Sequence, residues 1–193
     1  MTGGWLRVRP VEDADLARIR AIINHFIATS AFNFRTEPQT IDEWRSDWRR
    51  LHESYPWLAA VDDGRVVGVA YAVPWNYRSA YRWTVETSVY VDPETQRRGV
   101  GDALYANLLG RLRRQGFRGA VAVIALPNQP SVRLHERHGF TPVGMLRNAG
   151  FKLGAWHDVG FWQCVLTEAG GEAGHAGAGR GVSEPARSAD SHL

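Results

Sequence analysis

The sequence is poor in residues on which several kinds of protein depend. It has a single cysteine, Cys164, which excludes an intrachain disulfide and a zinc site built from several cysteines. Its apolar runs are too short to cross a membrane. The N-terminal stretch MTGGWLRVRPVEDAD lacks the apolar core of a signal peptide and soon turns acidic. Together these absences favour a cytoplasmic protein with no membrane partner.

A strong excess of one charge is also missing. The formal net charge is +3, and nearly all basic side chains are arginine, with Lys152 as the only lysine. Nucleic-acid-binding proteins usually carry a larger basic excess gathered on one face. The composition therefore argues against nucleic acid as a partner.

The length and hydrophobic content predict one folded domain followed by a tail. The chain has 193 residues, 44% of them hydrophobic, which is enough for a sizeable core. From about Glu168 the sequence consists mainly of Gly, Ala, Ser and charged residues. Such a segment cannot bury enough apolar surface to offset its ordering entropy. We therefore expect a domain over residues 1–167 and a disordered tail over residues 168–193.

The order of predicted elements indicates a mixed sheet. Strands are predicted at residues 6–11, in a hairpin over 57–73 that turns at Asp63-Gly64, and at 81–91, 119–126, 141–146 and 158–166. Helices are predicted from Asp13 to about Ala28, after a capping box of Thr40 and Glu43, from QRRGVG to Gly116, and from Pro130 at position N1 to Gly139. Antiparallel strands come first and strand–helix units follow. This order predicts an α/β (α+β mixed) sheet with helices on both faces.

The stretch QRRGVG, from Gln96 to Gly101, has the character of an anion site. Glycines before a helix expose backbone N–H groups, and the helix dipole adds partial positive charge. The Walker pattern is absent because no Lys-Ser/Thr pair follows the glycines. The dinucleotide pattern also fails, since its third glycine would fall at Leu104. The hexapeptide alone leaves open whether it binds phosphate or is a plain glycine turn.

Its context resembles the acyl-CoA-binding motif of the GNAT acetyltransferase superfamily, here Gln96-x-x-Gly99-x-Gly101 after a strand. The later segment ALPNQPSVRLHERHGF is similar to a second GNAT motif and supplies Asn128 and Ser131. NFRTEPQT, PWNYRSAYRWTVETSVYV and GFKLGAWHDVGFWQ extend the similarity to the phosphinothricin acetyltransferase family, which includes methionine sulfoximine and methionine sulfone acetyltransferases. The resemblance covers about residues 5–166.

The resemblance implies the GNAT acyl-CoA N-acyltransferase fold, with a mostly antiparallel central sheet flanked by helices, and acetyl-CoA as cosubstrate without a metal. It places the pantetheine arm along residues 89–91 and the pyrophosphate at residues 97–102. The implied cofactor-binding residues are Val89, Tyr90, Val91, Arg97, Arg98, Gly99, Val100, Gly101, Asp102, Asn128 and Ser131.

Two residues are candidates for proton transfer. An amine attacks a thioester only in its free form, so a base is needed. Glu86 lies among apolar and aromatic neighbours that could raise its pKa; the alternative is a surface carboxylate. His135 occupies a position where many GNAT members have a Tyr that protonates the thiolate, and its near-neutral pKa suits a base or an acid. The alternative is a histidine that satisfies a structural hydrogen bond.

The resemblance also implies an anionic amine substrate and a homodimer. Arginine suits carboxylate and phosphinyl oxygens. The implied substrate-binding residues are Phe34, Arg35, Asn76, Tyr77, Arg78, Tyr81, Glu86, Thr87 and Ser88. Asn76 departs from one subgroup, which has a basic residue there. The implied activity is acetylation of the α-amine of a phosphinothricin, methionine sulfoximine or methionine sulfone type of compound, by direct attack.

Two other hypotheses are compatible with the sequence. One is the same chemistry on another amine, such as a peptide N-terminus, a polyamine or an aminoglycoside. Arg35 and Arg78 argue for an anionic substrate instead. The other is a non-enzymatic acyl-CoA-binding module, against which Glu86 and His135 weigh.

Overall fold

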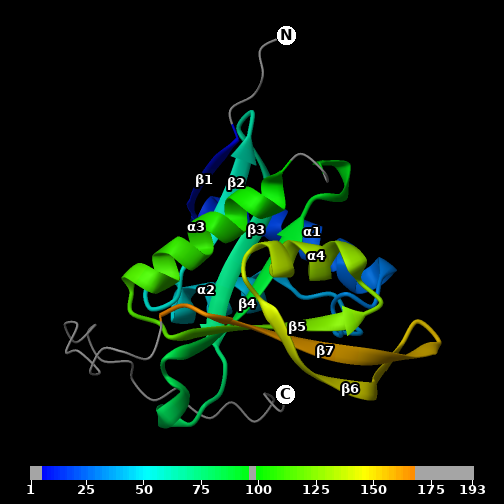
Figure 1. Ribbon diagram of the computed structural model, residues 1–193. Coiled ribbons are helices and arrows are strands. Elements are labelled where there is room, and N and C mark those ends of the chain that lie inside the picture. Colours follow the sequence, from blue (N-terminus) through cyan, green and yellow to red (C-terminus); the bar gives the residue numbers. More distant parts are fainter. Residues whose placement is uncertain (1–5, 96–98, 168–193) are drawn as a thin grey trace.

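A seven-stranded mixed sheet forms the centre of the protein (Figure 1). The structure is a computed structural model that describes residues 6–95 and 99–167. The strands lie in the order β1-β2-β3-β4-β5-β7-β6. Their bounds are β1 Arg7–Pro10, β2 Trp57–Asp62, β3 Arg65–Pro74, β4 Thr84–Val91, β5 Gly119–Leu126, β6 Thr141–Lys152 and β7 Ala155–Val165. The helices are α1 Leu16–Thr29, α2 Ile41–Leu51, α3 Val100–Arg114 and α4 Gln129–Arg137, with 3-10 turns at Asp13–Asp15, Ser79–Tyr81 and Pro93–Thr95.

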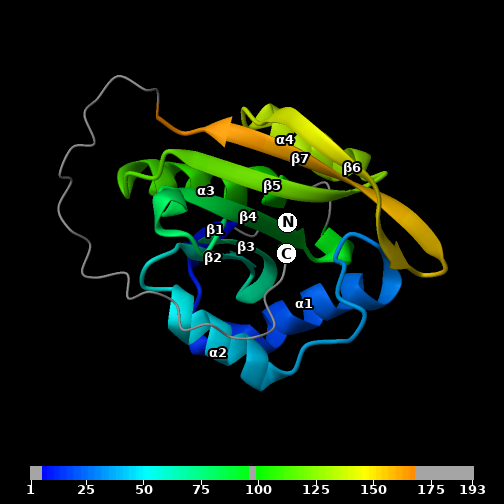
Figure 2. The same cartoon turned by 90° about the horizontal axis from the view of Figure 1, so that it is seen from below.

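Helices cover both faces of the sheet, as predicted. In Figure 2, α1 and α2 lie on one side of the strands, and α3 and α4 lie on the other. Helix α3 comes closest at Gly68 of β3, where an added Cβ would lie 3.1 Å from side chains of Leu104 and Val100. This bare backbone lets the helix sit directly on the sheet. Within the described residues, no helix is long and apolar enough to span a bilayer.

The feature that matters most for function is the pairing of β4 with β5. All other neighbouring strands are antiparallel, whereas β4 and β5 are parallel. Their pairing covers only three positions and ends at Glu86 opposite Val121. Beyond that point β4 still pairs with β3, and β5 still pairs with β7. The two strands therefore separate toward α4 and leave backbone groups of β4 facing an opening.

Two sequence predictions need correction. Strand β6 continues to Lys152, well beyond the predicted end at residue 146, and β7 begins at Ala155 instead of residue 158, because the pairing shifts register between Leu146 and Gly150 and then resumes. Asn148 adopts a positive φ of 48° within this irregularity, and a local bulge of this kind lets a strand continue through a stretch that resembles a loop. The helix expected to begin with Pro130 begins one residue earlier, after Asn128 as N-cap. The predicted tail, residues 168–193, lies outside the described residues.

Candidate active site

The opening between β4 and β5 is lined by side chains from β4, β5 and α4. A small pocket of about 50 Å³ lies there, bounded by Thr87, Ser88, Val89, Tyr90, Val123, Ser131 and His135. Six of these seven residues were predicted as site residues from the sequence. The unpaired edge of β4 can accept an extended ligand in the manner of an added strand.

The start of α3 has the geometry of an anion site. Gly99 is its N-cap, with φ +75°, and nothing lies within 4 Å of the position of an added Cβ. An added Cβ at Gly101 would come 3.1 Å from the Leu134 side chain of α4. Gly99 therefore leaves space at the helix N-terminus, where N–H groups and the dipole favour an anion, and Gly101 lets α4 pack closely against α3. Arg97 and Arg98 lie outside the described residues, so their predicted roles stay predictions.

Asp102, predicted to contact the cofactor, joins α3 to α4. Its carboxylate accepts from Arg137 Nη1 at 2.7 and 2.8 Å, and it lies 3.2 Å from His138 Nε2. Asn128 similarly caps α4 through Oδ1, which accepts from the Ser131 N–H at 3.2 Å. The Asp102 bonds tie the first turn of α3 to the C-terminal end of α4, and the Asn128 bond caps the N-terminus of α4. Whether either residue also contacts the cofactor stays a prediction.

His135 is the centre of a buried polar network. It is only 3% exposed. Its Nδ1 lies 2.7 Å from the backbone carbonyl of Ser131, which can only accept, so Nδ1 carries the proton. Its Nε2 lies 2.6 Å from the hydroxyl of Tyr105 and therefore accepts from it. Burial lowers the pKa of His135, so the ring is held neutral near pH 7.

Tyr105 was missed by sequence reasoning. It lies fully buried on α3, and its hydroxyl lies 3.2 Å from Thr87 Oγ1. The Thr87 hydroxyl, which also lines the small pocket, is 3.3 Å from the Val121 carbonyl. A tyrosine hydroxyl on the apolar stripe of a helix needs a buried hydrogen-bond partner. This requirement could have identified Tyr105 in the sequence as part of a buried polar network. The network thus runs from His135 through Tyr105 to Thr87 at the opening.

Glu86, Ser88 and Tyr90 lie on the face of β4 opposite to Thr87, as strand alternation predicts. Burial raises the pKa of Glu86. Burial also raises the pKa of Tyr90 to about 12, with further effects from its bond to Asn33 and from the charges of Glu86 and Arg35. Glu86 and Arg35, both predicted from the sequence, therefore lie close enough to Tyr90 to act on the same hydroxyl.

Tyr71 on β3 is a second residue that the sequence reasoning missed. It is paired with Ser88 across the β3–β4 ladder, and Ser88 partly offsets the rise in the pKa of Tyr71. Burial raises the pKa of its hydroxyl, and Glu86 adds to the effect. Trp57 stacks on its ring at 4.5 Å between centroids. Tyr71 thus presents a fixed neutral hydroxyl beside Glu86.

Six of the nine predicted substrate residues come from two loops, and the other three, Glu86, Thr87 and Ser88, lie on β4. Phe34 and Arg35 lie in the loop between α1 and α2. Asn76, Tyr77, Arg78 and Tyr81 lie in the loop between β3 and β4. There, Asn76 Oδ1 accepts from the Arg78 N–H at 3.1 Å, and the Arg78 guanidinium lies 5.2 Å from the centroid of the Tyr77 ring.

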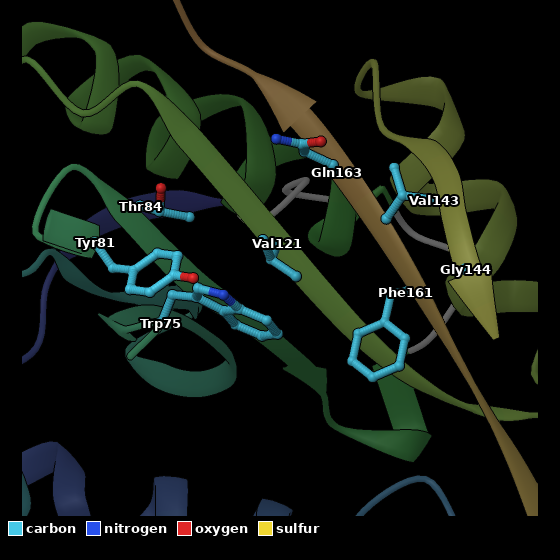
Figure 3. Close-up of a pocket in the computed structure, with 8 residues that line it drawn as sticks. All are labelled: Trp75, Tyr81, Thr84, Val121, Val143, Gly144, Phe161 and Gln163. Carbon is cyan, nitrogen blue, oxygen red and sulfur yellow. The ribbon is translucent and has the colours of Figure 1, made fainter. Parts of the chain in front are cut away.

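A larger pocket lies beside the β3–β4 loop. Figure 3 shows this pocket of about 340 Å³, lined by Trp75, Tyr81, Thr84, Val121, Val143, Gly144, Phe161 and Gln163. Val121 is paired with Glu86, and laterally paired residues of neighbouring strands point to the same face. The pocket is therefore on the Glu86 side of the sheet. Tyr81 is the only predicted substrate residue that lines it.

Comparisons with known proteins place the chain in a family. Residues 19–140 match the acetyltransferase (GNAT) family. The chain belongs to the GNAT acetyltransferase family. This match confirms the family and fold inferred from the sequence. The matched residues include β4, α3, β5 and α4, which surround the opening between β4 and β5.

Individual GNAT relatives are similar over most of the chain. The phosphinothricin N-acetyltransferase of Streptomyces viridochromogenes is 56% identical over 158 residues, 82% of this chain and 86% of that protein. An L-methionine sulfoximine/L-methionine sulfone acetyltransferase of Salmonella typhimurium is 34% identical over 165 residues, 84% and 96% of the two chains. The structure of a phosphinothricin acetyltransferase from Sinorhizobium meliloti, solved in complex with acetyl-CoA, matches with a TM-score of 0.80 at 34% identity, over 83% of this chain and 88% of that one. That relative binds acetyl-CoA, in agreement with the cosubstrate expected from the sequence.

Proposed function

We propose that this GNAT enzyme acetylates the α-amine of a small amino acid of the phosphinothricin, methionine sulfoximine or methionine sulfone type. The observation that carries the proposal is the opening between β4 and β5, with Glu86 on one side and the His135 network on the other. The names of its relatives support the acceptor class. We place the reaction in the cytoplasm, in keeping with the single cysteine.

The chain's own groups fit acetyl-CoA in two places. The free edge of β4 at Val89–Val91 offers backbone donors and acceptors to an extended pantetheine arm. The open N-terminus of α3 at Gly99–Gly101 offers N–H groups to the pyrophosphate. When bound, acetyl-CoA supplies an activated acetyl thioester. Backbone N–H groups of β4 would stabilise charge on its carbonyl oxygen.

Glu86 acts as the base. The amine nitrogen bonds to the carbonyl carbon, the carbon–sulfur bond breaks, and the nitrogen gives up one proton. Because burial raises the pKa of Glu86, its carboxylate is a stronger base than an exposed one. The neutral hydroxyl of Tyr71 lies in the same neighbourhood and adds no competing charge.

The leaving sulfur receives its proton through the His135 network. His135 is neutral at rest, so its Nε2 first takes up one proton from solvent; Nε2 then gives a proton to Tyr105, Tyr105 gives its hydroxyl proton to Thr87, and Thr87 gives its hydroxyl proton to the sulfur. The distances of 3.2 Å and 2.6 Å along this path support the transfer. His135 ends neutral, the form that its buried site favours.

Arg35 is the group proposed to hold the substrate's negative charge, because it lies in the electrostatic neighbourhood of Tyr71, Tyr90 and Glu86. A bidentate guanidinium–carboxylate contact would fix the amino acid in one orientation. Polyamines carry no such anion, so they are disfavoured as acceptors.

The acceptor class is tested by measuring CoA-thiol release from acetyl-CoA. The acceptors are phosphinothricin, methionine sulfoximine, methionine sulfone, spermidine and a short peptide, with a blank that lacks any acceptor. We expect turnover with the first three alone. Turnover only with spermidine or the peptide would contradict the proposed acceptor while leaving the GNAT chemistry in place.

The exposed apolar surface of β6 supports a homodimer. This strand is an edge of the sheet, and Val143, Met145 and Leu146 are 57%, 48% and 55% exposed. Native edge strands seldom leave such a row of apolar side chains uncovered. Val143 also borders the 340 Å³ pocket, so a second copy on this surface would complete that pocket.

Replacing Leu146 by Glu is expected to convert the dimer into a monomer, because a charge in an apolar interface must be desolvated. Size-exclusion chromatography with light scattering measures the mass. The control is Asn107→Glu, on the exposed side of α3. A monomeric parent protein, or a Leu146→Glu variant with unchanged mass, would contradict the homodimer.

A further inference from the structure

The only lysine of the chain is buried against backbone carbonyl groups. Lys152 ends β6 and is 6% exposed. Its Nζ donates to the backbone carbonyls of Ile27 and Asn33, both at 2.6 Å. Among the described residues, no acidic side chain forms an ion pair with it. Burial lowers the pKa of this amine. Burying an amine in this way costs free energy, which points to a role in the segments to which the two carbonyls belong.

The two carbonyls belong to the end of α1 and to the loop that follows it. Ile27 lies in the last turn of α1, where carbonyls lack partners within the helix and a cation is favoured by the dipole. Asn33 lies six residues further on, in the loop that carries Phe34 and Arg35. One ammonium therefore caps the helix and holds the loop.

The same loop is attached to the β6–β7 hairpin at a second point. The ring of Phe34 occupies the space that a Cβ on Gly150 would fill, and its centroid lies 6.3 Å from that of His157. His157 Nε2 lies 3.0 Å from the backbone carbonyl of Lys152, and this contact joins the two strands of the hairpin. Figure 2 shows the loop between α1 and α2 beside the closed end of this hairpin.

On its other side the loop reaches the strand of the active site. Asn33 Nδ2 donates to the Tyr90 hydroxyl at 3.1 Å, and Asn33 Oδ1 accepts from the Arg35 N–H at 2.9 Å. The position of Arg35 thus depends on Asn33, whose carbonyl is held by Lys152. The line of contacts runs from the hairpin through the loop to β4.

We propose that Lys152 is a positioning residue that holds the loop of Phe34 and Arg35 against β4 and so sets the affinity for the amine substrate. The proposal rests on the proposed function, in which Arg35 holds the negative charge of that substrate. Without the ammonium, two buried carbonyls lose their donor, and the loop moves outward to let water reach them.

Kinetic constants separate positioning from mere structural support. Lys152→Met, which keeps length but removes the donors, is expected to raise KM for phosphinothricin about tenfold or more, a loss of about 1.4 kcal/mol, with KM for acetyl-CoA nearly unchanged. Gly150→Ala, which displaces the Phe34 ring and leaves the ammonium alone, is expected to raise the same KM. The matched control is Leu153→Asn in the hairpin turn, where φ is +51° and the side chain is exposed. Folded Lys152→Met with an unchanged amine KM would overturn the proposal.

Chemical labelling tests the contact between Lys152 and the two carbonyls even if phosphinothricin is not the acceptor. Because the chain has one lysine, an amine-acylating reagent such as N-hydroxysuccinimidyl acetate can modify only Lys152 and the terminal amine. Mass spectrometry of the Lys152 peptide should show acylation of the folded wild type about 100-fold slower than in denaturant, and faster in Gly150→Ala than in Leu153→Asn. Equal rates in folded and denatured protein would contradict the contact of Lys152 with the carbonyls of Ile27 and Asn33. Protection without any phosphinothricin turnover would instead retain the contact and reject the acceptor.

Discussion

Replacing Glu86 by Gln is expected to lower kcat for phosphinothricin about 10²–10³-fold, with little change in KM for acetyl-CoA, because general base catalysis contributes on this scale. The change keeps the shape of the side chain and removes only its capacity to take a proton. Wild-type kcat should rise with pH through the raised pKa of Glu86, and the variant should lose that rise. Steady-state kinetics across pH measures both effects.

The same substitution is expected to stabilise the fold near neutral pH. Burial raises the pKa of Glu86 above its ordinary value of 4.5, so the folded state holds this proton more tightly than the unfolded state. The ionised form therefore destabilises the fold, increasingly as pH rises from the unfolded pKa to the folded one. Glu86→Gln should melt at a higher temperature than the wild type at pH 7, and the difference should narrow toward pH 4.

Glu53→Gln, an exposed carboxylate on the chain segment after α2, is the control for both measurements. It should change neither kcat nor the melting temperature appreciably. If Glu86→Gln keeps kcat within tenfold of the wild type, Glu86 is not the base.

Replacing Tyr105 by Phe is the second change with a large expected effect. It removes one hydroxyl, breaks the path from His135 to Thr87, and leaves His135 Nε2 without its partner. We expect kcat to fall about 10–100-fold, toward the lower end for a positioned proton-transfer group. Loss of the buried hydrogen bond should also lower the free energy of unfolding by about 1–3 kcal/mol.

A double-mutant cycle distinguishes a network from separate contributions. If His135 acts through Tyr105, combining Tyr105→Phe with His135→Asn should cost scarcely more kcat than either change alone. Tyr55→Phe is the matched control, since Tyr55 is a buried tyrosine that packs on Phe117 away from the site. Additive losses, or an unchanged kcat in Tyr105→Phe with the fold intact, would contradict the relay.

Local sequence signals predicted the features that depend on one or a few neighbouring residues. The hairpin turns at Asp63-Gly64, where both residues have positive φ. The capping box at Thr40 and Glu43 forms with both reciprocal bonds. Gly99 adopts the positive φ expected of a bare turn before α3. In each case the residue type itself restricts the backbone or supplies the bond, so the prediction needed no tertiary information.

Features that depend on distant parts of the chain were not predictable in this way. The partners of Lys152 lie more than 100 residues earlier, at separations of 119 and 125. Tyr105 finds His135 only because α3 and α4 pack on the same face of the sheet. The separation of β4 and β5 is a property of strand pairing that alternation within one strand does not encode.

In the proposed reaction, a small amino acid of the phosphinothricin, methionine sulfoximine or methionine sulfone type receives an acetyl group on its α-nitrogen from acetyl-CoA, and phosphinothricin is the first acceptor to test. The most direct measurement is to mix the protein with both compounds, identify the product by mass spectrometry and NMR, and count the CoA thiol released. We predict one N-acetylphosphinothricin for each thiol, and a rate that falls about 100-fold or more in Glu86→Gln. Binding of acetyl-CoA with no acetylated product, or acetylation that Glu86→Gln leaves unchanged, would contradict the account.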